Sequence, residues 1–560
     1  MKKILAITLT LLMAFTVAVF SASAADTNVA AIGEEKYESL AAAIVDADAG
    51  DTITLLSDVT GDVTINKNLT LDGAGKQYTG KISISGGKTV VIQNVNFVGG
   101  RVEANAKNTS NNLTVKGCNF EGTLSTYAII INSGSNLIIE DCNAKDIGQG
   151  LAYAKNSVTN IELKNVNIDG AIYGLNMVNN TTTTFDNVTM KNVTRGLQFQ
   201  TNGPKTITFN NCTISVVDNV NAAPVYISHK ADTTQTLVFK GTNDFGTDDL
   251  TFGSNLVKTK TEVAQIGDEK YLSLKEAVEN AKDGDVITII KDHEIADSEA
   301  FFGTLYTNYY VFLEVNDKKV TIDLNGKVVT INPDLDKMLL AVFLSIGNGE
   351  ITLKDSSEAM TGAINVIASD ATSVYSMFTA DEGGKFNIES GNYYINKLDI
   401  NYTHPRSMIY TGDDKHFTVT GGNFILGNAH TDVASNGSKH PWIFNGHGQG
   451  ETAIIVTGGT YNVDPTHCHG EAHFPDCYKP VEEAADKWTV KIVHTPGDAA
   501  TCKAAQTCTV CGTELDAIKD HKFVEYVSDN NATCTADGTK TAKCIYDCGK
   551  TDTVTDEGSI

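Results

Sequence analysis

The sequence predicts an all-β protein made of two tandem solenoids of stacked parallel strands, each opened by a short amphipathic helix, with small Cys/His modules at the end. Three observations lead to this fold class: a 30-residue block that occurs twice, strand motifs that recur every 22 to 30 residues, and a late cluster of cysteines. Repeats of that length are typical of solenoids, in which each repeat packs on its neighbours and buries a continuous core.

The repeated block divides the chain into two bodies. Residues 29–58 and 263–292 are identical at 16 of 30 positions. Because each copy opens a long series of short strands, the repeated opening indicates a repeated domain. We therefore expect the first solenoid to span 25–260 and the second to span 261–493.

Each copy of the block predicts a short helix that caps its solenoid. In the second copy Ser273 and Glu276 have the spacing of a capping box, and the apolar residues that follow lie on one helical face. Gly284 is expected to end this helix. The first copy matches it at Ser39, Leu40, Ala43, Ile44, Ala47 and Gly50. Such a helix would cover apolar core and the unpaired edge of the first strand.

Behind the first block, seven strand motifs recur at intervals of 23, 24, 24, 22, 24 and 30 residues. Each motif has a residue that tolerates left-handed backbone just before its inward anchor, which predicts a bend there. These residues are Asn94, Gly117, Asp141, Asn165, Asn187, Asn211 and Gly241. A second inward ladder is expected in each coil, including Leu151 with Tyr153. Three cysteines, Cys118, Cys142 and Cys212, stand on the anchor ladder and are expected in the core.

The start of the chain and its charge limit the function. Residues 1–24 combine two lysines, an apolar run and an Ala-x-Ala ending, which is typical of a secretory signal peptide. We therefore expect a secreted or cell-surface protein. No later apolar run approaches the ~20 residues that a membrane span needs. The net charge of −25 argues against nucleic acid as a partner.

The strand motifs VVIQNVNF, LTVKGCNF and LIIEDCNA resemble the coils of the right-handed parallel β-helix of the pectin-lyase-like superfamily, over residues 50–255. That fold hosts lyases, hydrolases, adhesins and passive surface proteins. The closing segment of the second body, with Tyr478 and Trp488, resembles the terminal coil of Gram-positive surface β-helices. The resemblance implies an exported surface protein that binds carbohydrate or host matrix without catalysis.

The alternative is a polysaccharide-active glycoside hydrolase or lyase. Gly-Asp413-Asp414 and Gly-His447-Gly resemble motifs of polygalacturonase-type hydrolases on this fold, where paired carboxylates supply acid and base. No Arg-x-Lys follows His447, so that family's contact with a substrate carboxylate is missing. Gly-rich turns also select Asp and Gly for backbone reasons. Whether the chain is an enzyme stays open, with Asp413, Asp414 and His447 as the catalytic candidates.

Eight of the eleven cysteines lie between residues 468 and 548. Two similar modules, expected at 494–520 and 521–560, each contain a His, then Ala-Thr-Cys, then a close Cys pair before Gly. The expected metal ligands are His494, Cys502, Cys508 and Cys511 in the first module, and His521, Cys534, Cys544 and Cys548 in the second. Three thiolates and one imidazole complete a tetrahedral zinc shell, which predicts structural zinc with no open position.

Disulfides are the alternative, because they are usual in exported chains. Three cysteines per module would leave one unpaired, which favours metal. An insertion before the modules offers Cys468 and Cys477, either as a disulfide that closes a small loop or as metal ligands. The second module stops at DEGSI, so we expect it to be truncated.

Overall fold

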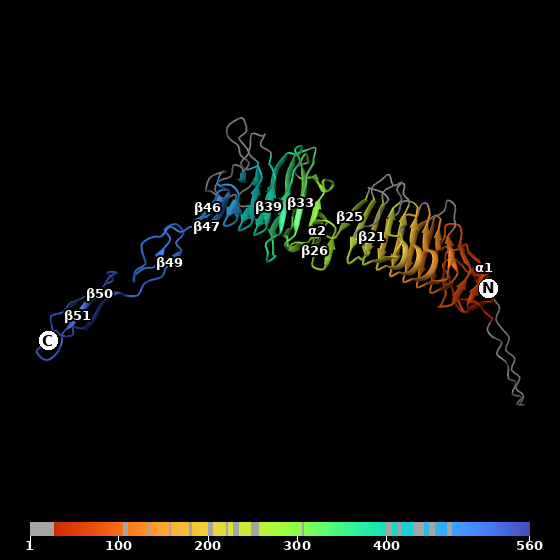
Figure 1. The fold of residues 1–560 in the computed structure, drawn as a ribbon, viewed down its shortest axis with the longest axis horizontal. Helices are drawn as coiled ribbons and strands as arrows, with labels where there is room; N and C mark the ends of the chain where they lie inside the picture. Colours follow the sequence, from red (N-terminus) through yellow and green to blue (C-terminus); the bar gives the residue numbers. More distant parts are fainter. Residues whose placement is uncertain are drawn as a thin grey trace, which may run out of the picture. The chain divides into compact units, whose positions relative to one another are not determined.

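The structure, a computed structural model, describes residues 27–560 except 105–109, 133, 156–157, 179–181, 200–204, 220–221, 228–234, 248–256, 305–306, 336, 399–405, 413–415, 429–441, 447–453 and 467–472. The chain divides into two compact units, one ending at Thr261 and one starting at Glu262 (Figure 1). Among the described residues, no helix is both long and apolar enough to cross a membrane.

The first unit is a parallel β-helix whose coils add strands to two sheets (Figure 1). Leu113 pairs in parallel with Val90 of one coil and with Leu137 of the next, so backbone bonds run from coil to coil. The first sheet runs, in order of pairing, through β2 (Glu35–Tyr37), β1 (Ala30–Ile32), β3 (Thr52–Leu55), β6 (Leu69–Asp72), β9 (Thr89–Gln93), β12 (Asn111–Lys116), β15 (Gly134–Glu140), β17 (Asn160–Lys164), β19 (Thr182–Asp186), β21 (Lys205–Asn210), β24 (Gln235–Lys240) and β25 (Val257–Thr261).

The second sheet of this unit is formed by the remaining strands of each coil. In chain order they are β4 (Val59–Thr60), β5 (Val63–Ile65), β7 (Gln77–Thr79), β8 (Lys81–Ile84), β10 (Asn96–Val98), β11 (Arg101–Ala104), β13 (Asn119–Glu121), β14 (Leu124–Ile131), β16 (Asn143–Ala154), β18 (Asn167–Met177), β20 (Thr189–Phe199), β22 (Thr213–Val216) and β23 (Ala223–Ile227).

The predicted bends are confirmed. All seven bend residues have positive φ, between 52° and 60°. The amides at the bends also bond along the stack, since Asn187 Nδ2 donates to Asn165 Oδ1 and Asn165 Nδ2 donates to Asp141 Oδ1, both at 2.9 Å. The cysteines on the anchor ladder, Cys118, Cys142 and Cys212, are buried in the core as expected.

The second inward ladder differs from the expectation in one coil. Ile129 pairs with Ala152, which pairs with Leu175, so Ala152 rather than Leu151 stands on this ladder. The cause is an irregularity between Lys145 and Gly148, which gives β16 one residue more than β18. A slip of one residue moves a side chain to the other face of a sheet. Tyr153 is therefore a half-buried residue of the outer face, not a core residue.

Both helical caps are present. Helix α1 (Leu40–Asp46) and helix α2 (Leu274–Asn280) begin after serines whose hydroxyls accept backbone N–H groups. Glu276 of α2 accepts from Leu272 N at 2.9 Å, one residue ahead of the expected partner. The apolar face of each helix joins the core of its own unit. Gly284 does not end α2, because the helix ends at Asn280.

A lysine from the following coil contacts the C-terminal end of each helix. The sequence did not predict these two contacts. Lys67 Nζ donates to the carbonyls of Val45 and Ala47 at the end of α1. Lys318 Nζ donates in the same way to Val278, to Glu279 at 3.3 Å and to Ala281 at 3.2 Å. An ammonium group at this position satisfies carbonyls that have no partner in the helix and opposes the negative end of the helix dipole.

The second unit is a parallel β-helix in which three sheets enclose the core. The first contains β26 (Ala264–Ile266), β27 (Glu269–Tyr271), β28 (Asp285–Ile289), β32 (Lys319–Asp323), β35 (Glu350–Lys354), β38 (Lys385–Ile388), β41 (Phe417–Val419) and β44 (Ile454–Val456). The second contains β29 (His293–Ile295), β33 (Val328–Ile331), β36 (Ala363–Val366), β39 (Asn392–Ile395), β42 (Asn423–Leu426), β45 (Thr460–Tyr461), β46 (Tyr478–Ala484) and β47 (Lys487–Ile492). The third contains β30 (Phe301–Phe302), β31 (Tyr310–Asn316), β34 (Leu339–Ile346), β37 (Val374–Ala380), β40 (Ser407–Thr411) and β43 (Trp442–Gly446).

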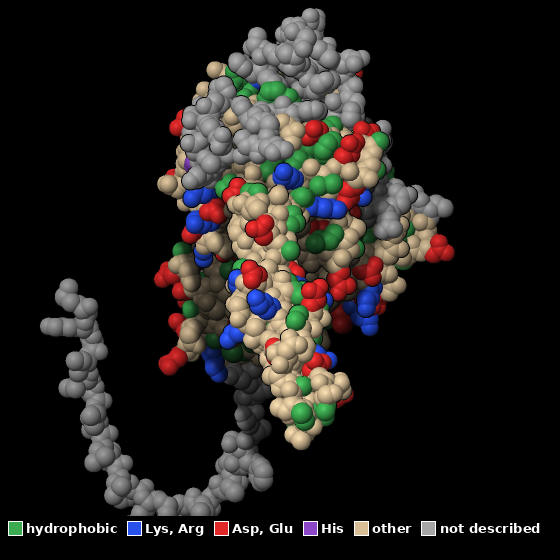
Figure 2. All heavy atoms as spheres, turned by 90° about the vertical axis from the view of Figure 1, so that its left-hand side faces the viewer, with side chains coloured by type: hydrophobic (Ala, Val, Ile, Leu, Met, Phe, Trp, Pro, Cys, Tyr) green, Lys and Arg blue, Asp and Glu red, His purple; other side chains and the backbone are tan. Residues whose placement is uncertain are grey.

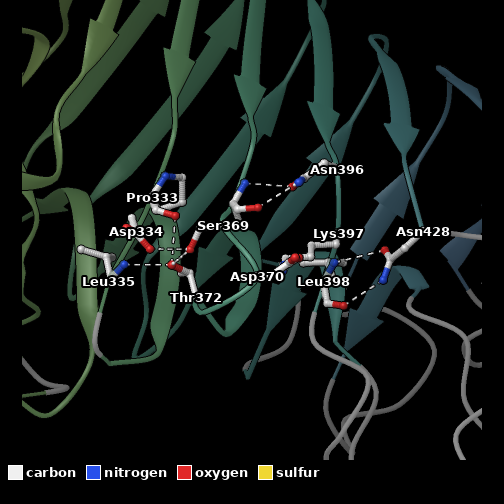
Figure 3. A network of polar contacts seen from close by, with 11 residues as sticks. Pro333, Asp334, Leu335, Ser369, Asp370, Thr372, Asn396, Lys397, Leu398 and Asn428 are labelled. Atoms are coloured by element: carbon white, nitrogen blue, oxygen red, sulfur yellow. Dashed lines mark hydrogen bonds and ion pairs between the residues drawn. The ribbon is translucent and has the colours of Figure 1, made fainter.

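Side-chain amides hold the turns of this unit in register (Figure 3). Asn396 Nδ2 donates to the carbonyl of Ala368, and its Oδ1 accepts the N–H of the same residue, both at 2.9 Å. Asn428 bonds Leu398 of the preceding coil in the same way, at 2.9 and 3.1 Å. Beyond the ends of the strands, each side-chain amide thereby satisfies one backbone N–H and one carbonyl that strand pairing would otherwise satisfy.

A hairpin closes the second β-helix. Strands β46 and β47 are antiparallel, and Trp488 of β47 pairs with Tyr461 of β45, so β47 joins the last parallel coil. The chain continues into two small sheets, one of β48 (Gln506–Thr507) and β49 (Glu514–Asp516), the other of β50 (Phe523–Ser528), β51 (Thr539–Cys544) and β52 (Thr551–Thr555).

Candidate functional sites

The catalytic candidates Asp413, Asp414 and His447 lie outside the described residues. The strands that lead to them are in register, because Thr411 at the end of β40 pairs with Gly446 at the end of β43. Nearby, the guanidinium of the buried Arg406 lies 4.1 Å from the ring centre of Tyr375.

The outer surface of the first β-helix carries a group of aromatic and amide side chains that we call the tyrosine face. It comprises Tyr127, Tyr153, Tyr173, Asn176, Arg195, Gln198 and Tyr226, from strands β14, β16, β18, β20 and β23. The parallel register places Tyr173 beside Arg195, and places Asn176 between Tyr153 and Gln198. Five successive strands therefore contribute to one continuous surface.

The tyrosine rings are stacked on one another. The Tyr127 ring lies 5.0 Å from that of Tyr153 and 5.9 Å from that of Tyr173, measured between ring centres. Gly150 makes this possible, because a Cβ at that position would lie 2.5 Å from Tyr173 O and 3.0 Å from the Tyr127 ring. Tyr127 is buried, and its half-buried neighbours Tyr153 and Tyr173 present ring surface to solvent.

Polar groups extend this face. Asn176 Nδ2 donates to the Tyr127 hydroxyl at 2.7 Å, while Asn176 Oδ1 is buried and has no hydrogen-bond partner in the part of the chain that the structure describes. The Arg195 guanidinium donates to Gln198 and lies 3.8 Å from the ring centre of Tyr226. A buried carbonyl oxygen without a partner is rare in native proteins, and one explanation is that a ligand donor completes it.

Sequence reasoning missed the tyrosine face because it placed Tyr153 with Leu151 on the inward ladder. The recurrence of Tyr at positions 127, 153 and 173 was the available signal. This recurrence could be interpreted only once the irregularity in β16 was known, because the extra residue turns the Tyr153 side chain outward.

The Cys/His modules form two groups, each of three cysteines and one histidine. The first group is Cys477, His494, Cys508 and Cys511, and the second is Cys502, His521, Cys544 and Cys548. In each group the four ligand atoms all lie within 4.8 Å of one another. Both groups could therefore hold a metal ion.

This grouping differs from the expectation in one residue of each group. Cys502 lies with the second group rather than the first, and Cys477 takes its place in the first group. Cys534 is exposed and lies outside both groups. The expected sets assumed that each module supplies its own ligands, whereas the structure takes one cysteine of each set from the preceding segment. Cys468, the other half of the expected loop disulfide, lies outside the described residues.

The two groups have the same internal geometry. In the first, Cys477 Sγ lies 3.3 Å from Cys508 Sγ, and Cys511 Sγ lies 3.3 Å from His494 Nδ1. In the second, Cys502 Sγ lies 3.7 Å from Cys544 Sγ, and Cys548 Sγ lies 3.3 Å from His521 Nδ1. In both groups the remote cysteine contacts the first member of the close pair, and the histidine contacts the second member.

These distances fit a tetrahedral metal site and do not fit disulfides. Zinc–sulfur bonds of about 2.3 Å place two ligands of a tetrahedron about 3.8 Å apart, close to the sulfur–sulfur distances found here. A disulfide requires sulfur atoms about 2.05 Å apart. The described cysteines, all ten of them, are free thiols.

The pKa values of the thiols differ within each group. Backbone hydrogen bonding, first from Cys511, lowers the pKa of Cys508 to about 5, although burial acts against it. Burial raises the pKa of Cys544, but hydrogen bonds from the Tyr546 backbone and the His521 ring outweigh it and lower that pKa to about 6. The first cysteine of each close pair is therefore a thiolate at neutral pH, the form that binds metal.

The face of the molecule shown in Figure 2 intermixes Lys and Arg with Asp and Glu side chains.

Comparisons with known proteins found weakly similar solved structures and a family model that matches part of the first unit. A mutant of the PL6 family alginate lyase AlyGC is 9% identical, with 75% of this chain and 87% of that chain covered and a TM-score of 0.17. A mutant tailspike protein of E. coli bacteriophage HK620, in complex with a pentasaccharide, is 12% identical, with 74% and 73% covered and a TM-score of 0.16. Likenesses this weak say nothing about what this chain binds. No curated protein matches the chain. Residues 49–190 match the family model described as right handed beta helix region, which gives the hand of the first β-helix.

Proposed function

We propose that this chain is an exported, non-catalytic β-helix protein of a bacterial surface, and that it binds the carbohydrate of a cell surface or matrix through its tyrosine face. The observation that carries the proposal is the stacked set of tyrosines beside the unpartnered, buried Asn176 Oδ1. The apolar start of the sequence supports export.

The chemistry of the tyrosine face suits a sugar. Aromatic rings offer flat apolar surface with a polar edge, and sugar rings have C–H faces that stack on such surfaces. The few polar groups fix orientation, as in most small-ligand sites. Asn176 Oδ1 would accept a hydroxyl of the sugar, and Arg195 supplies donors beside Tyr226. Because five strands of a rigid stack hold these groups, little ordering is needed on binding.

A glycan array with the mature protein, followed by titration of the best ligand, tests this proposal. Tyr173→Ala should weaken binding about tenfold, because one such stacking surface contributes about 1.4 kcal/mol. Asn176→Ala should weaken it as well, with some loss of stability because the hydrogen bond to the Tyr127 hydroxyl is removed. Ile172→Ala is the matched control, since Ile172 is exposed on the same strand and lies outside the tyrosine face. If Tyr173→Ala and Ile172→Ala bind equally well, the tyrosine face is not the site.

For the Cys/His groups we propose structural zinc. The donor set of three sulfurs and one nitrogen, and its distances, support zinc rather than calcium or magnesium, which take oxygen ligands. Four protein ligands leave no open position for a reactive water. Metal analysis with thiol counting tests the proposal, and about one zinc per group is expected. Fully oxidised cysteines would rule it out.

A polysaccharide-active enzyme is the second candidate. The register of β40 and β43 favours it, because the residues after Thr411 and Gly446 follow strands that are neighbours in the stack. Release of reducing ends or unsaturated products from a polysaccharide panel would support this function. It would have to disappear in a variant with Asp413→Asn and Asp414→Asn, while binding at the tyrosine face is kept.

A further inference from the structure

We propose that each metal ion joins two consecutive segments of the chain, so that the metals, rather than an apolar core, hold the Cys/His tail together. This inference rests on the zinc binding proposed above and extends it. It concerns which parts of the chain each ion connects, and it makes different predictions from metal binding alone.

The first ion would connect the closing hairpin of the second β-helix to the first module. Cys477 stands immediately before β46, whose partner β47 is paired to the last parallel coil through Tyr461 and Trp488. The remaining ligands, His494, Cys508 and Cys511, follow that hairpin in the chain. A metal bound by all four residues therefore links the hairpin to the segment after it.

The second ion would connect the first module to the second. Cys502 lies between His494 and Cys508, which are ligands of the first group, yet it reaches Cys544 at 3.7 Å. Its other partners, His521 and Cys548, belong to the segment that contains β50, β51 and β52. The two ligand sets are thus interleaved along the chain.

Few other contacts hold these segments. None of the three hydrophobic clusters of the described residues includes a residue beyond Val490. Large apolar side chains of the tail are exposed instead: Val510, Ile518, Val524, Val527, Ile545 and Val554. Between the two modules, the structure shows Lys503 Nζ donating to Asp547 O. Within the first module, Lys519 N donates to Thr501 O at 3.0 Å. Segments without a core of their own generally need metal or disulfides to fold.

Cys534 supplies an internal control. It closes an Ala-Thr-Cys sequence like the one that ends at Cys502. Cys502 nevertheless joins a group of four ligands, whereas Cys534 is exposed and belongs to neither group. Replacing either cysteine removes one thiol from the same sequence context, but only Cys502→Ser removes a metal ligand.

The test is a cleavage experiment on the full chain. A recognition sequence for a site-specific protease is inserted between Ala517 and Ile518, in an exposed stretch that separates Cys511 from His521. After cleavage under reducing conditions with zinc present, the fragment that begins at Ile518 is expected to co-elute with the rest of the protein in size-exclusion chromatography. Chelation of zinc should release it completely.

Variants assign the attachment to the metal. Cys502→Ser should release the cleaved fragment even with zinc present, while Cys534→Ser should retain it. Lys503→Met should also retain it, which would show that the Lys503–Asp547 contact does not hold the fragment.

Zinc counting in the uncleaved protein distinguishes failure of zinc binding from failure of the bridging inference. If the chain binds no zinc, the zinc proposal fails and this inference with it. If the chain binds two ions and the wild-type fragment is nevertheless released, the bridging inference alone is overturned. Retention that survives chelation and ends on stronger reduction would indicate a disulfide and also overturn it.

Discussion

Cys502 Sγ lies 3.7 Å from Cys544 Sγ although 42 positions of sequence separate the two residues. Cys477 and Cys508 repeat this relationship at 3.3 Å over 31 positions. Because the same arrangement occurs twice, each group of three cysteines and one histidine begins with a cysteine well ahead of its histidine. A module defined by its histidine and close cysteine pair alone lacks one of the four residues of its group.

Zinc counting in paired variants distinguishes the two possible groupings. The structure places Cys502 and Cys548 in the same group. Cys502→Ser, Cys548→Ser and the double variant should therefore each retain one zinc ion per chain. If Cys502 instead belonged with Cys511, the double variant would lose both ions. Cys534→Ser should retain two, and mass spectrometry of the intact protein gives the counts.

The sequence predicted the solenoid well and the metal groups only in part, for physical reasons that particular residues show. The bends at Asn165 and its equivalents were predictable because few residue types tolerate left-handed backbone. The burial of Cys118 followed from local periodicity in the same way. Tyr153 was expected in the core, but a one-residue irregularity in β16 turns its side chain to the outer face. Neither the composition nor the repeat length of the sequence indicates this irregularity.

The two Cys/His groups depend on contacts across the chain, which spacing alone does not determine. Residue type and the close pairs predicted six of the eight residues that the structure brings together in these groups. Cys502 and Cys477 could be assigned only once the path of the chain between modules was known. Cys534 has the same local sequence as Cys502, so local sequence could not distinguish a ligand from an exposed thiol.

Lys318→Met should destabilise the second β-helix by about 1 kcal/mol. The Lys318 ammonium bonds the carbonyls at the end of α2, and a cation at a helix C-terminus contributes about that much. Lys319→Met is the matched control, because Lys319 is exposed and its ammonium forms a surface ion pair with Glu350, at 3.3 Å. Urea unfolding followed by circular dichroism measures both variants. Equal effects would show that the helix end does not depend on Lys318.

Asn165→Ala should destabilise the first β-helix by about 1 to 2 kcal/mol, and Asn165→Gly should cost less. At φ 53°, alanine adopts a strained backbone that glycine adopts freely. Both variants lose the amide bonds to Asp141 and from Asn187, so their difference isolates the backbone term. Urea unfolding midpoints give the comparison. A glycine variant less stable than the alanine variant would show that backbone strain is not the dominant effect.

Lys205 makes the stability of the first β-helix depend on pH above neutrality. Its Nζ, at the start of β21, is buried with no hydrogen-bond partner among the described residues, and burial lowers its pKa to about 8. An unfolded lysine titrates near pH 10.4, so between about pH 8 and 10.4 the unfolded chain binds more protons and stability rises with pH. Below pH 8 the whole penalty, about 3 kcal/mol, is present.

Lys205→Met should therefore raise the free energy of unfolding by up to about 3 kcal/mol at pH 7, and this gain should shrink as the pH rises to 10.4. The comparison needs urea unfolding of the wild type and the variant at several pH values between 7 and 10.5. Lys191→Met is the control, because Lys191 is exposed in the same unit and its removal should change stability little at any pH. A gain that stays constant across this range would attribute the effect to packing rather than to the buried charge.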